Sequence, residues 1–110
     1  MANAADLRRI ALALDGTVEL PHFDRRAFKV KRTYVTLAPD GKSANFKFTV
    51  DEQEMKCMLL PEAFAPVTGG WGKMGWTTAT LSKLDRADLK AALETAWAQA
   101  VAKKPSKKTS

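Results

Sequence analysis

The chain has 110 residues, of which 45% are apolar, so it is long enough for one domain with a packed core and too short for two. A single cysteine and a single histidine exclude an internal disulfide and a zinc site built from these residue types alone. No apolar stretch approaches the roughly 20 residues of a membrane span, and no basic region followed by an apolar one marks a signal peptide. We therefore expect a cytoplasmic protein with no metal, no cofactor and no membrane contact.

The net charge of +6 is distributed unevenly along the chain. Residues 103–110 carry four lysines and no acid, and without them 14 basic residues stand against 12 acidic ones. A basic segment of this kind attracts nucleic acid or anionic surfaces without selectivity, although it is more often simply a solvated end. We expect a single domain over residues 1–104 and a basic, disordered tail over residues 105–110.

The first half of the chain changes from a helical to a strand period. Leu7, Ile10, Ala11 and Leu14 are spaced as one helical stripe, which predicts a helix over about residues 3–14 that ends at the following Asp-Gly pair. Apolar and polar residues then alternate with a period of two, which is typical of half-buried strands. The alternating apolar positions are Phe28 and Val30, Val35 and Leu37, and Phe46, Phe48 and Val50, after a short strand over Thr17–Leu20 that we expect to end at Pro21.

The second half is predicted to be mostly helical. A capping box formed by Asp51 and Glu54 begins a helix whose inner face would carry Met55, Met58 and Leu59. A short helical turn over residues 61–64, a loop rich in glycine and tryptophan over residues 67–77 and a strand over residues 77–81 follow. We call residues 67–77 the Gly/Trp loop. The C-terminal helix is capped by Asp85, and its apolar face is formed by Leu89, Leu93, Trp97 and Val101.

These elements predict an α+β fold. We expect a two-layer sandwich in which an antiparallel sheet of about five strands is covered on one face by the N- and C-terminal helices. The other face of the sheet would be exposed, because the strands alternate between apolar and polar residues.

Few residues offer catalytic chemistry. A nucleophilic pair would have to combine Cys57 with His22, and no motif beside either residue indicates one. The Gly72-Lys73 pair resembles the end of a phosphate-binding loop, but that motif needs glycine at position 67 and serine or threonine at position 74, where the chain has Val67 and Met74. We therefore predict that the protein is not an enzyme.

The strand region is strongly basic on its predicted outer face. Residues 25–32 contain five basic residues and no acid. Such a face suits weak, sequence-tolerant binding of nucleic acid through phosphate charge, with an aromatic side chain for stacking. The alternative is an ordinary solvated sheet face, on which lysines deter aggregation. The candidate contacts are Arg25, Arg26, Lys29, Lys31, Arg32, Lys47 and Tyr34.

The Gly/Trp loop is the alternative binding element. Trp71 and Trp76 could stack on a base or line a shallow pocket, with Lys73 beside them, or they could anchor the loop on the core. In the first case the protein would be a binding module for a small ligand or a protein partner.

Several segments together resemble the MmcQ/YjbR-like family. They are Ala27–Val30, the run from Leu59 to Val67 with its Pro-Glu-Ala-Phe core, the Trp-Gly-Lys-Met-Gly-Trp-Thr segment ending at Thr77, and Ala91–Trp97. The resemblance covers about residues 5–104. It implies a compact α+β fold shaped like the frataxin/CyaY sandwich, also called a double-wing fold, and a DNA-binding function. It brings no catalytic residues, and the absence of a long acidic stretch in the first helix argues against iron binding.

Overall fold

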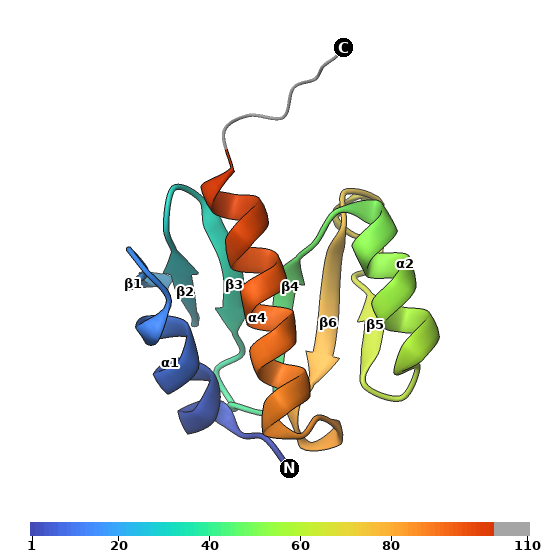
Figure 1. Cartoon of the computed structure of the whole chain (residues 1–110), viewed down its shortest axis with the longest axis horizontal. Coiled ribbons are helices and arrows are strands. Elements are labelled where there is room, and N and C mark those ends of the chain that lie inside the picture. The colour runs from blue at the N-terminus through green and yellow to red at the C-terminus, as the bar shows by residue number, and fades with distance from the viewer. Residues whose placement is uncertain (103–110) are drawn as a thin grey trace.

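Two helices, α1 (Ala4–Ala13) and α4 (Arg86–Val101), lie side by side on one face of an antiparallel sheet (Figure 1). The computed structural model describes residues 1–102, so the predicted tail lies outside the described residues. The helix α2 (Val50–Leu59) flanks the far edge of the sheet on the same side. This arrangement confirms the predicted α+β sandwich with both terminal helices on one face.

The sheet has six strands in the order β1-β2-β3-β4-β6-β5, and every neighbouring pair is antiparallel. The strand β5 was not expected, because its three residues are too few to show alternation. The edge strand β1 continues through Pro21 rather than ending there, since an edge strand tolerates a residue without an amide hydrogen. The strands are β1 (Val18–His22), β2 (Arg25–Lys29), β3 (Thr33–Leu37), β4 (Ser43–Lys47), β5 (Phe64–Pro66) and β6 (Trp76–Thr80).

The core lies between the sheet and the helices α1 and α4. Phe28, Val35 and Phe46 are paired across β2, β3 and β4, and all three are fully buried. Leu89 and Leu93 of α4 are buried as well, as the predicted apolar face of that helix requires. None of the helices within residues 1–102 has the length and apolar composition needed to cross a bilayer.

The predicted start and inner face of α2 are wrong. Thr49 caps this helix in a capping box with Glu52, two residues earlier than expected. Its inward side carries the buried Gln53 and the partly buried Cys57, whereas the predicted inner residues Met55, Met58 and Leu59 are 58%, 71% and 68% exposed. The polar Gln53 takes the inward position because its side-chain amide donates to the backbone carbonyls of Gly72 and Trp76, which lie against this side of α2.

An acidic residue links α1 and α4 at their N-terminal ends. Asp6 is buried, forms a capping box with Asn3, and accepts from Arg9 at 2.8 Å and from Arg86 at 3.3 Å. The hydrogen bond from Arg9 is the main cause that lowers the pKa of this carboxyl below its ordinary value, against an opposing effect of burial. The charged form of Asp6 is therefore favoured by folding.

We expect Asp6→Asn to be less stable than the unchanged protein at pH 7 and to lose less stability on acidification. A carboxyl group whose pKa is lower in the folded state stabilises the fold above its unfolded pKa, and that contribution disappears as the pH falls through the folded value. Urea denaturation at several pH values between about 5 and 2 would measure the difference. Parallel stability profiles for the two proteins would contradict the role given to Asp6.

Candidate nucleic-acid interface

The face of the sheet that the helices leave uncovered is a continuous surface across all six strands. Residues paired across neighbouring strands share a face, and Ala27, Thr36 and Asn45 occupy successive positions of one such row. The row continues from Leu20 at one edge to Thr78 and Ala65 at the other. We call this surface the open face.

Three of the predicted contact residues lie on the open face. Arg25 and Lys29 occupy β2 positions of the same parity as Ala27, and Lys47 lies two residues after Asn45 in β4. Within the described strands, no aspartate or glutamate occupies a position on this side. The strand residues of the open face therefore carry only positive charges, and Glu52 of α2 acts on Lys47 from outside the strands.

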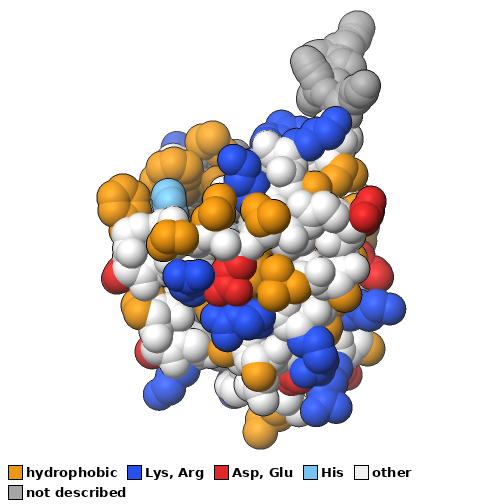
Figure 2. All heavy atoms as spheres, turned by 90° about the vertical axis from the view of Figure 1, so that its left-hand side faces the viewer, with side chains coloured by type: hydrophobic (Ala, Val, Ile, Leu, Met, Phe, Trp, Pro, Cys, Tyr) orange, Lys and Arg blue, Asp and Glu red, His pale blue; other side chains and the backbone are white. Residues whose placement is uncertain are grey.

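Arg26 points to the opposite side of the sheet. It has the same parity as the buried Phe28, and its guanidinium donates to Glu19 at 2.8 Å. Glu19 also accepts from Arg8 of α1, and these contacts lower the pKa of its carboxyl. Figure 2, which faces the β1 edge, shows basic and acidic side chains next to each other there. The positive charge of Arg26 is therefore paired with Glu19 and does not contribute to the open face.

The remaining basic candidates lie outside the open face. Arg32 donates to the backbone carbonyls of Gln99 and Ala102 at the C-terminal end of α4, each at 3.3 Å. Lys31 is exposed in the loop between β2 and β3. Lys73 is exposed in the short helix α3 (Gly70–Lys73), which is formed within the Gly/Trp loop.

Tyr34 lies in the core, which corrects the prediction that it projects from the outer face. Its side chain is fully buried, and its hydroxyl lies 2.8 Å from that of Thr17 and donates to the carbonyl of Ala11 in α1. The pairing of β2 with β3 is irregular at this point: Phe28 pairs with Val35 and Lys29 with Thr33, so Tyr34 is an extra residue without a partner in β2. Such a bulge breaks the alternation and turns the side chain toward the helices.

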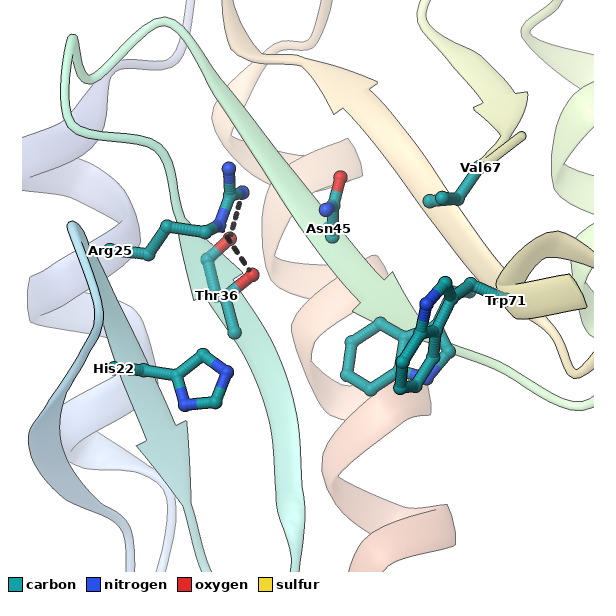
Figure 3. A pocket seen from close by; sticks show the side chains of 7 residues that line it. His22, Arg25, Thr36, Asn45, Val67 and Trp71 are labelled. Carbon is teal, nitrogen blue, oxygen red and sulfur yellow. Dashed lines mark hydrogen bonds between the residues drawn. The ribbon is translucent and has the colours of Figure 1, made fainter. Parts of the chain in front are cut away.

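A pocket of about 200 Å³ opens on the open face (Figure 3). Figure 3 shows side chains from β1 and β2 on one side, Asn45 between them, and Val67 and Trp71 on the other, with α4 behind the strands. Arg25 is held in place by Thr36, because its Nε donates to the hydroxyl at 3.0 Å and its Nη2 donates to the carbonyl at 3.2 Å. The lining residues are His22, Arg25, Thr36, Asn45, Val67, Trp71 and Trp76.

The tight turn between β1 and β2 places an exposed aromatic ring beside this pocket. Phe23 is 94% exposed and has a φ of 60°, which is uncommon for a bulky residue. Its ring meets that of His22 edge-on, with 4.9 Å between the centroids. Figure 2 shows hydrophobic side chains gathered around the histidine, which is the only one in the chain. The turn therefore adds an exposed apolar ring next to His22, which lines the pocket.

The Gly/Trp loop forms the opposite wall. Trp71 and Trp76 meet edge-on with 6.4 Å between their centroids. Trp71 is 61% exposed, so it lines the pocket instead of anchoring the loop in the core. The anchor is Gln53, whose amide donates to the carbonyls of Gly72 at 2.9 Å and Trp76 at 3.0 Å. Gly75 fits against the carbonyl of Phe48, where its φ of 104° and the close approach leave no room for a side chain.

A second pocket, of about 180 Å³, lies where the sheet meets the C-terminal end of α4. Trp76 lines both pockets, and Arg32 and Lys47 line the second. Burial and then the charge of Arg32 lower the pKa of Lys47, against an opposing effect of Glu52, and the Nζ of Lys47 donates to the carbonyl of Phe48 at 3.4 Å. Among residues 1–102 the buried Oε1 of Gln99, which also lines this pocket, has no hydrogen-bond partner. An anion here would interact favourably with both cations but could not satisfy the Oε1 of Gln99, which only accepts hydrogen bonds.

The two residues considered for nucleophilic chemistry are on different sides of the sheet. His22 lines the pocket on the open face, and Cys57 packs from α2 against the core. Burial raises the pKa of the Cys57 thiol, which is opposite to the shift that activates a cysteine. Among residues 1–102, no group of three histidine, cysteine, aspartate or glutamate side chains is arranged to hold a metal ion.

Four of the residues that line the first pocket were not named from the sequence as ligand contacts. Alternation does place Thr36 and Asn45 on the outer face. Threonine and asparagine are common on solvated strands, however, so nothing in the sequence indicates that these two line a pocket. His22 was expected in a surface loop, and Val67 was considered only for its mismatch to the phosphate-binding motif. The contact that brings Val67 here is nonlocal: its amide donates to the carbonyl of Trp76 at 3.0 Å.

Two comparisons with known proteins, one with family models and one with solved structures, found matches to this chain. Residues 12–99 match the model of the YjbR family. The crystal structure of Deinococcus radiodurans protein DR2400, with the family-model domain DUF419, superposes with a TM-score of 0.80 at 23% sequence identity. The match covers 97% of this chain and 84% of that one, and it shows a shared fold. No curated protein matches the chain. From the family model, which spans most of the chain, we conclude that the protein belongs to the YjbR family.

Proposed function

We propose that this protein is a non-enzymatic module that binds nucleic acid on the open face, mainly through phosphate charge. The proposal rests on the charged residues that lie on that face. Arg25, Lys29 and Lys47 lie on it, no acidic strand residue does, and two tryptophans stand at one side. A positive groove with accessible aromatic rings is the usual surface for sequence-tolerant binding of single strands.

The second pocket supports a continuous path for a phosphate backbone. Trp76 lines both pockets, so a strand crossing the open face from Arg25 would pass this ring and reach Lys47 and Arg32. Lys47 is already partly desolvated, which makes a phosphate partner more favourable than it would be for a fully hydrated lysine. The separation of His22 from Cys57 argues against a nucleophilic site formed by this pair.

Salt-dependent binding tests this proposal. With about three phosphate contacts, the logarithm of the affinity for single-stranded DNA should fall with a slope of about −2 against the logarithm of salt concentration, which is on the order of 10–20-fold between 50 and 200 mM. Lys29→Ala should reduce the slope by about 0.7. Fluorescence anisotropy with a labelled oligonucleotide would measure both quantities.

Lys90→Ala is the matched control. Lys90 lies on α4, on the covered side of the sheet, where it pairs with Glu94 at 3.7 Å, and its replacement changes the net charge by the same amount. This variant should retain the slope of the unchanged protein. If both variants change the slope equally, or if neither does, the contacts are not on the open face and the proposal fails.

A further inference from the structure

The two sides of the first pocket differ in chemistry. One wall is apolar and consists of Val67 and the indole of Trp71, which Trp76 meets edge-on. The facing side and floor carry Arg25 and Asn45, with His22 at the edge. A ligand that fills this space needs a flat ring for the first wall and hydrogen-bond acceptors for the second.

The polar groups are held in position and keep unused donors. Arg25 contacts Thr36 through Nε and Nη2, which fixes the guanidinium and leaves Nη1 without a partner among residues 1–102. Asn45 accepts from the hydroxyl of Thr78 at 2.8 Å through its Oδ1, and within the same residues its side-chain NH₂ group has no partner. Both unused groups are donors, so they suit carbonyl, ring-nitrogen or phosphate acceptors.

The aromatic wall is equally preorganised. Gln53 holds the carbonyls of Gly72 and Trp76, and Gly75 fits closely against Phe48, so the segment that carries the indoles is fixed to the sheet and to α2. The edge-on contact with Trp76 orients Trp71 without covering it, because Trp71 is 61% exposed. An exposed, oriented indole is a stacking platform that loses little entropy on binding.

The size of the pocket limits the ligand to one ring system. Its volume of about 200 Å³ is below the roughly 300–1,000 Å³ typical of sites that enclose a drug-sized molecule. The pocket is also shallow, because Trp71 and His22 at its mouth are exposed to solvent. A ring that enters it can thus stay attached to a chain that continues over the open face.

We infer that this pocket receives a single unstacked nucleobase, with Trp71 as the stacking surface, Asn45 donating to the edge of the base and Arg25 donating to the base or its adjoining phosphate. This inference rests on the proposed function and narrows it to single-stranded nucleic acid. In a duplex the bases are paired and stacked on one another, so their faces are not available to an indole.

Four probes of the full chain test the inference by fluorescence anisotropy and tryptophan fluorescence. They are a labelled ten-nucleotide thymine oligonucleotide, the same backbone with abasic positions throughout, a duplex of equal length, and thymidine monophosphate. The thymine strand should bind at least about tenfold more tightly than the abasic strand, because stacking on one aromatic side chain contributes that much per base. It should also bind more tightly than the duplex at equal salt.

Trp71→Ala should remove the preference for the thymine strand over the abasic strand, and Trp71→Phe should restore part of it. Met74→Ala is the control, because Met74 is exposed in the same segment but does not line the pocket. Circular dichroism would confirm that each variant folds. Loss of the preference in Trp71→Ala with its retention in Met74→Ala supports the inference.

The outcomes separate the inference from the proposed function. Equal, salt-sensitive binding of the thymine and abasic strands would overturn the base pocket and leave phosphate binding intact. No binding of any strand at 50 mM salt would overturn both. Thymidine monophosphate binding as tightly as the strand would support the base-and-phosphate chemistry of the pocket but overturn a nucleic-acid strand as its source.

Discussion

Replacement of Gly72 by alanine should lower the free energy of unfolding by about 2–3 kcal/mol. A Cβ atom at this position would lie 1.9 Å from the carbonyl oxygen of Val67 and 3.0 Å from its carbonyl carbon. Both contacts involve backbone, so no side-chain rotation relieves them. Either α3 or the segment before it must move, and such overpacking in a buried position strains the surrounding structure.

The displacement would affect a second set of contacts. The carbonyl of Gly72 accepts one of the two hydrogen bonds donated by Gln53, which is only 8% exposed. A shift of α3 that breaks this bond leaves a buried amide hydrogen unpaired, which adds to the steric cost. We therefore expect Gly72→Ala also to disturb Trp71, and hence any ligand binding that depends on this ring.

Gly70→Ala is the matched control for this prediction. Gly70 belongs to the same short helix, but a Cβ atom there would have no neighbour within 4 Å. Since alanine has the higher helix propensity, this variant should be as stable as the unchanged protein or slightly more stable. Urea denaturation followed by circular dichroism at 222 nm would compare the three proteins. Equal midpoints for Gly72→Ala and Gly70→Ala would show that Val67 moves away at little cost.

The main features of the fold follow from local sequence patterns. The period of two in β2 and β4 buries Phe28 and Phe46 and places Lys29 and Lys47 on the open face. The cap of α4 at Asp85 was also predicted, and the side chain of Asp85 accepts from the amide of Asp88 at 2.7 Å. These features depend on neighbours one to four residues apart, which a sequence shows directly.

The features that were missed depend on contacts between distant segments. Gln53 takes the inward side of α2 because it binds carbonyls 19 and 23 residues away, and no helical period reveals such partners. The pocket likewise exists because residues 67–76 fold back beside β4 and Arg25 is fixed by β3. Arg26 is a different case. It lies two residues before Phe28, so alternation already places it on the covered side, but the prediction took the basic residues 25–32 as one group.

The corrected position of Tyr34 leads to the second large effect. Tyr34→Ala should destabilise the protein by about 3–5 kcal/mol, because it empties the space of a fully buried aromatic ring and removes the partner of the Thr17 hydroxyl. Trp71→Ala should change stability by only about 0.5 kcal/mol, since most of that ring is in solvent. Urea denaturation at pH 7 would measure both values.

Tyr34→Phe tests the contacts of the Tyr34 hydroxyl in the core without emptying the space of the ring. The variant keeps the ring and loses the hydroxyl, which should cost about 1 kcal/mol because the contacts to Thr17 and Ala11 are lost. Its affinity for a thymine oligonucleotide should equal that of the unchanged protein, whereas Trp71→Ala should bind more weakly at unchanged stability. Unchanged stability of Tyr34→Phe would contradict the buried contacts of its hydroxyl, and unchanged affinity of Trp71→Ala would contradict the stacking surface on the open face.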